Sequence, residues 1–402
     1  MGAGGGARRQ SFDGIVCIGG EDWWYHNRGH FDFQIMRRLA RDWPVLFVNS
    51  LGVRMPSLKD NRVFAGRIAR KLKSLAQGMV NVENGFWVFS PLTVPGETGQ
   101  RLSGWALGPQ IRFAAARAGI RRPVVWMHCP AGVGLIDDFA DAPMVLQRTD
   151  RFESFPEGDS ALIGRQIAAL KARADLVVYA APHLMAEEAG AVRRQLLVTH
   201  GVDHDVFVAA GVANGPEPDD VSAILQPRVG FVGGIDAHTF DPPLLLEVAR
   251  RMPDVAFVLI GSSSLPEGWC PLPNVHQLGR KPYAEVARYM AAMDVLVMPW
   301  NDSPWIQACN PIKLKEYLAV GRAVVTTDFP ALDGWRDLVR VAKGPAAFAE
   351  AIRAALSEPY DPSEARRRTV VESWEAKAAL VRDGILAMGL AYAPRSAART
   401  AA

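Results

Sequence analysis

Two apolar runs that each end in a pair of glycines constrain the fold of this chain more than any other feature. Residues 15–20 read IVCIGG and residues 229–234 read VGFVGG. Short apolar runs without alternation are typical of strands buried on both faces of a parallel sheet, and glycines at a strand end let the backbone approach a ligand closely. Segments with alternating helical and strand-like patterns follow each run. The pattern predicts an α/β fold with two doubly wound, Rossmann-like domains in tandem.

A change in composition separates the two sets of alternating helical and strand-like segments. Glycines and prolines accumulate over residues 209–227, where the helical and strand-like patterns stop. Ligands of doubly wound sheets bind at the carboxyl ends of the strands, so we expect the two domains to face a central cleft. The expected organisation is a disordered leader (1–12), a first domain (13–208), a linker (209–227), a second domain (228–360), a C-terminal helix packing back on the first domain (361–391) and a tail (392–402).

Composition excludes several classes of protein. The chain has 402 residues with 45 Lys and Arg against 42 Asp and Glu, a net charge of +3 that is too balanced to indicate a nucleic-acid partner. The four cysteines are scattered without a C-x-x-C pair, as expected in a reducing compartment, and suggest no metal site. No run of about 18 apolar residues predicts a membrane span, and the N-terminus lacks an apolar signal core. We therefore expect a cytoplasmic protein.

One segment suggests a membrane surface. Residues 63–77, VFAGRIARKLKSLAQ, form a basic amphipathic pattern with apolar residues on one face. Such a helix can lie on an anionic bilayer, here the inner face of the plasma membrane, as a peripheral association. The alternative is an ordinary domain helix with a solvated basic side.

Residues 310–327, NPIKLKEYLAVGRAVVTT, predict a loop, a helix, a turn and a strand. Asn310 is a good helix start before a proline, and Gly321 is a good helix end. The N-terminus of a helix attracts anions, so Lys313 could hold a phosphate there while Glu316 holds a hydroxyl-rich sugar. The alternative is an ordinary αβ unit with a surface Lys–Glu pair.

Taken together, these segments resemble the GT-B-fold glycosyltransferases, and within them the large retaining, nucleotide-sugar-dependent family, in particular its teichuronic-acid and exopolysaccharide branch. The resemblance covers nearly the whole chain. In the second half it is carried by RVGFVGGIDAHTFDPPLL, FVLIGSSS, LPNVHQLGRKPYAEVARYMAAMDVLVMPW and NPIKLKEYLAVGRAVVTT, and in the first half by CIGGEDWWYHNRGHFDFQIMRRLA, TDRFESFP, ARADLVVYAAPHL and THGVDHDVF.

The resemblance implies an activity. The chain would move a sugar from a nucleotide-diphosphate sugar to a glycan or lipid-linked acceptor in cell-envelope or exopolysaccharide biosynthesis. The reaction would be retaining, with no metal and no cofactor besides the donor, and the absence of an Asp-x-Asp motif after an early strand agrees with this expectation. Two alternatives remain: a two-domain sugar- or nucleotide-binding protein without turnover, and a nucleotide-sugar epimerase on the same fold.

The resemblance also assigns the donor side. Glu316 would bind the ribose hydroxyls, and Lys313 with the helix N-terminus would meet the diphosphate. The other donor-side residues it implies follow the strands of the second domain: Gly233, Gly234, Gly261, Arg280, Lys281 and Asn310.

Residues of the first domain are expected on the acceptor side. The loop after the first strand would line it with five residues: Gly19, Gly20, Trp23, Trp24 and His26. The tryptophans could stack on a sugar ring. The candidate catalytic residues are His30, His128 and Asp150. Each histidine could instead be structural, and Asp150 could be a cap at a strand end rather than a base.

Two positions depart from the family pattern. The first acid of the usual E-x7-E pair would fall at Ala308, and no Lys or Arg follows Gly234 in the sequence Ile-Asp-Ala-His. We therefore expect Lys313 to take over the phosphate contact.

Overall fold

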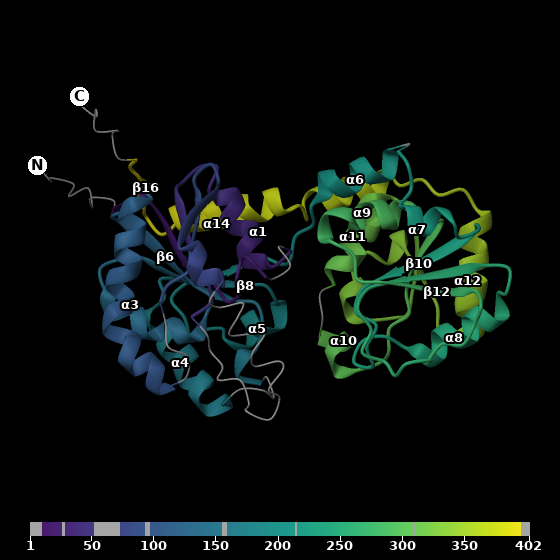
Figure 1. The fold of residues 1–402 in the computed structure, drawn as a ribbon, viewed down its shortest axis with the longest axis horizontal. Coiled ribbons are helices and arrows are strands. Elements are labelled where there is room, and N and C mark those ends of the chain that lie inside the picture. Colours follow the sequence, from purple (N-terminus) through teal and green to yellow (C-terminus); the bar gives the residue numbers. More distant parts are fainter. Residues whose placement is uncertain are drawn as a thin grey trace, which may run out of the picture. The chain divides into compact units, whose positions relative to one another are not determined.

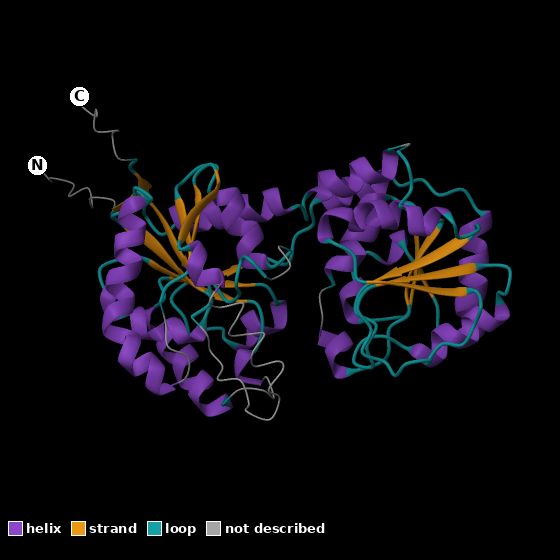
Figure 2. Ribbon diagram, in the orientation of Figure 1, coloured by secondary structure: helices purple, strands orange, loops and turns teal. Residues whose placement is uncertain are grey.

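Parallel β-sheets organise each half of the chain. The computed structural model describes residues 10–25, 29–51, 73–92, 97–154, 159–213, 215–308 and 311–394. The chain divides into two units, one formed by residues 1–199 with 377–402 and the other by residues 200–376 (Figure 1). Helices lie on both sides of the main sheet in each unit (Figure 2).

The first unit contains an eight-stranded sheet with the order β4-β5-β3-β2-β6-β7-β8-β9. All neighbouring strands are parallel except β4 and β5. The strand order reverses between β2 and β6, as in a doubly wound fold. The strands are β2 (Gly14–Ile18), β3 (Val45–Val48), β4 (Met79–Glu83), β5 (Phe86–Phe89), β6 (Pro123–Met127), β7 (Met144–Arg148), β8 (Leu176–Tyr179) and β9 (Gln195–Leu197).

The second unit contains a six-stranded, fully parallel sheet with the order β12-β11-β10-β13-β14-β15. In chain order this is 3-2-1-4-5-6, the Rossmann arrangement, with its reversal between β10 and β13. The predicted α/β class with two doubly wound domains is therefore confirmed. The strands are β10 (Arg228–Val232), β11 (Ala256–Ile260), β12 (Val275–Gly279), β13 (Val295–Met298), β14 (Ala323–Thr326) and β15 (Arg340–Val341).

Helices connect these strands. In the first unit they are α1 (Phe31–Leu39), α3 (Glu97–Arg117), α4 (Ser160–Arg173) and α5 (Pro182–Glu187). In the second unit they are α6 (His204–Val212), α7 (Asp219–Ser222), α8 (Pro242–Arg251), α9 (Tyr283–Ala291), α10 (Pro304–Ala308), α11 (Ile312–Val320), α12 (Pro345–Ser357) and α13 (Ser363–Val370). Helix α14 (Trp374–Leu386) begins in the second unit and continues in the first. Short 3₁₀ turns cover Pro130–Leu135, Asp137–Phe139, Phe152–Ser154, Pro330–Leu332 and Arg336–Leu338.

The chain crosses between the units after residue 199 and after residue 376. Residues 209–227, expected as a linker, lie in the second unit, where α6 and α7 bury Phe207 and Val221 in the core. Residues 361–376 also belong to the second unit, and residues 377–402 to the first.

The described part of the expected leader is ordered. Ser11 and Phe12 form strand β1, which pairs in parallel with β16 (Ala391–Tyr392) near the other end of the chain. The ring of Phe12 is fully buried and makes an edge contact with Trp43. Residues 1–9 and 395–402 lie outside the described residues.

Helix α11 is held in the second unit from several directions. The Lys315 ammonium, nearly buried, donates to the carbonyl of His200 at 2.7 Å and to Glu372 at 2.5 Å. The guanidinium of Arg366 caps the C-terminal end of α11 by donating to Val320 O at 3.0 Å. On α6, a Cβ added to Gly211 would lie 1.8 Å from the same Val320 oxygen. These contacts fix α11 against α6 and α13, so its position depends on a close approach that only glycine allows at residue 211.

We predict opposite effects for two Gly→Ala changes in helices. Gly211→Ala should lower the free energy of unfolding by about 1–3 kcal/mol, because α6 and α11 must separate to admit a methyl group. Gly164→Ala in α4, where the added carbon would contact nothing within 4 Å, should be neutral or stabilise by up to about 1 kcal/mol. Chemical denaturation of both variants checks the pair. Equal effects would show that α6 and α11 are not closely packed at residue 211.

Candidate functional site

The sheet of the second unit splits at its carboxyl edge. Strand β10 pairs with β11 as far as Val232, but its register with β13 extends only as far as Gly230. This is the point at which the strand order reverses, where ligands of open α/β sheets bind. The loop that leaves β10 there contains Gly233 and Gly234, as expected from the sequence.

The hydroxyl of Tyr317, on α11, lies at this split. It accepts a hydrogen bond from Val232 N at 2.8 Å and lies 3.3 Å from Val232 O. Its side chain is fully buried, and burial raises the pKa of the phenol above its ordinary value. Tyr317 thus replaces the missing strand partner and fixes α11 against the end of β10. The sequence analysis missed this residue, although a tyrosine among the apolar residues of the expected helix was a signal.

Glu316 is the buried acid of this site. Its side chain is 1% exposed, and Oε2 accepts from the Lys313 ammonium at 2.7 Å. The other oxygen, Oε1, has no hydrogen-bond partner among the described residues. Burial raises the pKa of the Glu316 carboxyl, Lys313 offsets part of this effect, and the negative charge of Asp203 adds to it. An unpaired buried oxygen is costly and is relieved by a group that donates a hydrogen bond.

Close backbone packing explains the glycines at the strand ends. A Cβ at Gly261, whose φ is 153°, would lie 1.7 Å from the Gly233 oxygen. Gly261 N donates in turn to Gly279 O at 3.0 Å. The backbones at the ends of β10, β11 and β12 therefore lie so close together that residue 261 has no room for a side chain.

Not every expected donor-side residue gathers at this split. The Lys281 ammonium pairs with Asp220 on α7 at 2.5 Å and lies 5.2 Å from the centre of the Tyr289 ring. Asn310 and the side chain of Ala308 lie outside the described residues. The nucleotide role of Arg280 and Lys281 stays a prediction.

The loop that follows Gly234, where the family pattern has a Lys or Arg, is fixed by hydrogen bonds of Asp236 and Ser303. The Asp236 carboxylate accepts from the backbone N–H groups of His238 at 2.9 Å and of Thr239 at 3.0 Å. Ser303 donates its hydroxyl to the His238 carbonyl at 2.7 Å. These bonds connect the loop to the segment after β13.

A second set of polar residues lies at the reversal point of the first sheet. His128 follows β6, and its Nδ1 lies 2.9 Å from Asp32 Oδ2. Asp32, in the first turn of α1, is fully buried and also accepts from Gly20 N at 3.2 Å. Burial by itself would raise the pKa of Asp32, but His128, His30 and the Gly20 N–H outweigh it and hold this pKa below its ordinary value. The sequence analysis named His128 and missed Asp32, because nothing in the pattern of α1 distinguishes this acid from a residue that favours a helix N-terminus.

The other residues expected on the acceptor side or as catalytic residues differ in their exposure to solvent. Trp23 is 1% exposed and packs against Phe33 and Phe86, which places its ring in the core rather than on a sugar-binding surface. Trp24 is half-buried, and both His30 and Asp150 are exposed. His26 lies outside the described residues, as do residues 63–72 of the expected basic helix, whose remaining residues 73–77 are helical.

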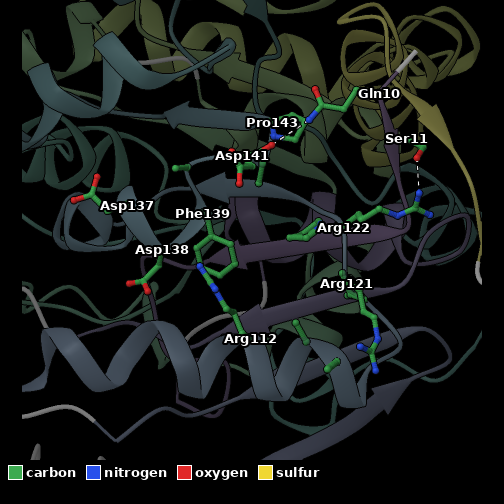
Figure 3. Close-up of a pocket in the computed structure, with 16 residues that line it drawn as sticks. Gln10, Ser11, Arg112, Arg121, Arg122, Asp137, Asp138, Phe139, Asp141 and Pro143 are labelled. Carbon is green, nitrogen blue, oxygen red and sulfur yellow. Dashed lines mark hydrogen bonds between the residues drawn. The ribbon is translucent and has the colours of Figure 1, made fainter. Parts of the chain in front are cut away.

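A large cavity lies at the opposite edge of the first sheet. It measures about 630 Å³ and is lined by Pro123 and Pro143 at the amino ends of β6 and β7, whereas neither Gly20 nor His128 lines it. Figure 3 shows its lining residues. In Figure 3 the Arg112 side chain extends toward the Phe139 ring, whose centre is 5.5 Å from its guanidinium carbon. Both arginines and aspartates line the cavity, so its charge does not select one ligand class. Among the described residues, no group of His, Cys, Asp or Glu is arranged to hold a metal ion.

We predict that Glu316→Gln stabilises the ligand-free protein at neutral pH. A raised folded pKa makes a carboxylate destabilising above its unfolded pKa, so the variant should have a higher free energy of unfolding than the wild type at pH 7. The gain should vanish as pH falls below about 4, where the wild-type carboxyl is protonated in both states. Thermal unfolding between pH 4 and 7 measures this. Glu364→Gln is the control, because Arg367 lowers the pKa of that exposed acid, and it should give no gain.

Comparison with known proteins gives a family match within the second unit. Residues 226–358 match the family described as "Glycosyl transferases group 1". A Bacillus subtilis (strain 168) protein named "Putative teichuronic acid biosynthesis glycosyltransferase TuaH" is 36% identical over 143 residues, which are 33% of this chain and 34% of TuaH. The chain thus matches about a third of the length of this curated relative.

Solved structures agree over the whole chain. Anabaena Alr3699/HepE in complex with UDP and glucose has a TM-score of 0.61 at 13% identity, covering 93% of this chain and 99% of HepE. Sucrose-phosphate synthase from Thermosynechococcus elongatus has a TM-score of 0.60 at 16% identity, covering 94% and 98%. An E. coli trehalose-6-phosphate protein bound with UDP-2-fluoro glucose has a TM-score of 0.60 at 10% identity, covering 95% and 100%.

No described helix has the length and apolar character needed to cross a bilayer. The strand order of both sheets, the likeness to these structures and the family match agree with one another. The chain has the GT-B fold, and residues 226–358 in its second unit match the group 1 glycosyltransferase family.

Proposed function

We propose that this protein is a glycosyltransferase that moves a sugar from a nucleotide-diphosphate sugar to a glycan or lipid-linked acceptor in cell-envelope or exopolysaccharide biosynthesis. The observation that carries the proposal is the buried Glu316: its Oε2 accepts from Lys313, while its Oε1 has no hydrogen-bond partner in the described part of the chain. A pair of vicinal ribose hydroxyls supplies the donors that such a carboxylate lacks.

The diphosphate has a binding surface in the same helix. The N-cap of the nine-residue helix α11 is Pro311, which makes no side-chain cap, so among the described residues no N-cap side chain competes with an anion for the first N–H groups. Lys313 lies in that first turn with a side chain 27% exposed. The helix dipole and this ammonium would stabilise the leaving diphosphate without a metal.

The relatives support the finer details. HepE was solved with UDP and with UDP-glucose, which favours a uridine-diphosphate sugar as the donor. The name of TuaH favours an envelope polymer as the product. We propose a retaining, hexosyl-type transfer in the cytoplasm. His128, His30 and the Gly19–Gly20 loop would lie on the acceptor side, and residues 63–77 would associate with an anionic membrane surface.

We predict that Glu316→Ala and Lys313→Ala both impair use of the donor. Glu316→Ala should weaken nucleotide binding and lower turnover, with a loss in kcat/KM of about tenfold or more, because it removes hydrogen bonds to a charged group. Lys313→Ala should mainly raise the KM for the nucleotide sugar. Release of nucleoside diphosphate from a panel of nucleotide sugars, with and without lipid-linked acceptors, measures both effects.

A matched control lies on α13 in the same unit. Arg367 and Glu364 form an exposed pair that also has a spacing of three residues and an N–O distance of 2.7 Å, so Glu364→Ala should leave kcat and KM unchanged. Undiminished transfer by Glu316→Ala would exclude the nucleotide assignment. Nucleotide binding without release from any sugar would favour a binding protein, and interconversion of sugars without release would favour an epimerase.

A further inference from the structure

Asp32 is a buried acid of the first unit with hydrogen-bond partners on both oxygens. Its Oδ2 accepts from Gly20 N at 3.2 Å and lies 2.9 Å from His128 Nδ1, while its Oδ1 accepts from Phe33 N at 2.9 Å. The residue is fully buried at the first turn of α1. A carboxylate can only accept hydrogen bonds, so the ring nitrogen that faces it carries a proton.

The other nitrogen of His128 faces a hydroxyl. Nε2 lies 3.3 Å from Thr149 Oγ1. When the imidazole is neutral and Nδ1 is protonated, Nε2 is an acceptor, so the Thr149 hydroxyl donates to it. Asp32, His128 and Thr149 therefore form a chain of hydrogen bonds whose direction is set by the buried carboxylate.

The chain of hydrogen bonds lies where the first sheet is open to ligands. Gly20 follows β2, His128 follows β6 and Thr149 follows β7, at the carboxyl edge next to the reversal of strand order. A Cβ on Gly20 would lie 2.7 Å from the His128 ring, so glycine lets the loop close over the imidazole.

The end of β7 is also fixed. The buried guanidinium of Arg148 bonds Glu153 at 3.0 Å and Glu188 at 2.8 Å, which holds the residue that precedes Thr149. Asp32, His128 and Thr149 are thus carried by three different elements: α1, the end of β6 and the end of β7.

We propose that Asp32 is a positioning residue that keeps His128 in the Nδ1–H form, so that Nε2 accepts a hydrogen bond from a hydroxyl: that of Thr149 in the ligand-free protein and a sugar hydroxyl of the substrate during transfer. The proposal rests on the proposed function for the identity of that hydroxyl. The alternative role for Asp32 is a structural one, as an acid that only stabilises the first turn of α1.

The tautomer of His128 tests this without any activity. In ¹⁵N-histidine-labelled protein at pH 8.5, about two units above the ordinary histidine pKa of about 6.5, two-bond ¹H–¹⁵N spectra distinguish Nδ1–H from Nε2–H. The His128→Gln variant identifies the signals of residue 128. We expect Nδ1–H in the wild type and Nε2–H in Asp32→Ala, which removes the carboxylate that accepts from Nδ1. Asp32→Asn can still present an oxygen to both Gly20 and His128, so it should restore Nδ1–H.

Activity should follow the same order. Asp32→Ala should lower kcat by about 10- to 100-fold, by analogy with the loss seen when the partner that orients a metal-bound histidine is removed, with little change in the affinity for UDP. Asp32→Asn should recover part of the loss. The control is Asp13→Ala, because Asp13 is also buried and accepts backbone N–H groups, from Arg121 at 3.0 Å and from Arg122 at 2.8 Å, but it precedes β2 at the other edge of the sheet. It should change stability and leave both the tautomer and kcat as in the wild type.

Two results would overturn the proposal: a proton on Nε2 in the wild type, or a tautomer and kcat in Asp32→Ala equal to those of the wild type. If Asp32→Ala does not fold, the wild-type tautomer and the kcat of Asp32→Asn still decide it. If no nucleotide sugar is turned over, the proposed function fails while the tautomer series still tests the link between Asp32 and His128.

Discussion

In the second unit the parallel sheet does not keep its strands paired to their ends where the strand order reverses, and the candidate site depends on this gap. The crossover after β10 leads to β11 on one side, and the crossover after β13 leads to β14 on the other side. No crossover therefore connects β10 directly to β13. In the second unit β10 stays paired with β11 to Val232 but with β13 only to Gly230. The hydroxyl of Tyr317 satisfies the backbone groups left over, and this brings Glu316 and Lys313 to the same edge.

Helix α11 therefore joins structure and chemistry. One set of its residues is fixed by the surrounding fold: Lys315 binds the His200 carbonyl, and the Val320 carbonyl is capped by Arg366. The other set, Lys313 and Glu316, lies near its N-terminal end. Because the helix is held at several points, the position of these two charges is set before any ligand arrives, which reduces the cost of ordering them on binding.

The two buried acids at the reversal points show how partners decide the role of a carboxylate. Asp32 accepts hydrogen bonds on both oxygens, and its pKa is held below the ordinary value in spite of burial. Glu316 has Lys313 on one oxygen and no described hydrogen-bond partner on the other, and its pKa is raised. A satisfied acid suits the orientation of a neighbouring side chain, whereas an unsatisfied one is suited to a ligand that donates hydrogen bonds.

The sequence by itself determined the α/β class, the two tandem sheets and the glycine loops, because apolar runs and strand-end glycines are local properties of the chain. It also singled out Lys313, Glu316 and His128 as candidates. Only the tertiary structure placed the unit boundary before α6, because that depends on which core buries Phe207. It alone placed Trp23 in the core and paired Lys281 with Asp220. Asp32 and Tyr317 could not be recognised from the sequence, because their partners are 96 and 85 residues away and meet them only after the strands are ordered in the sheets.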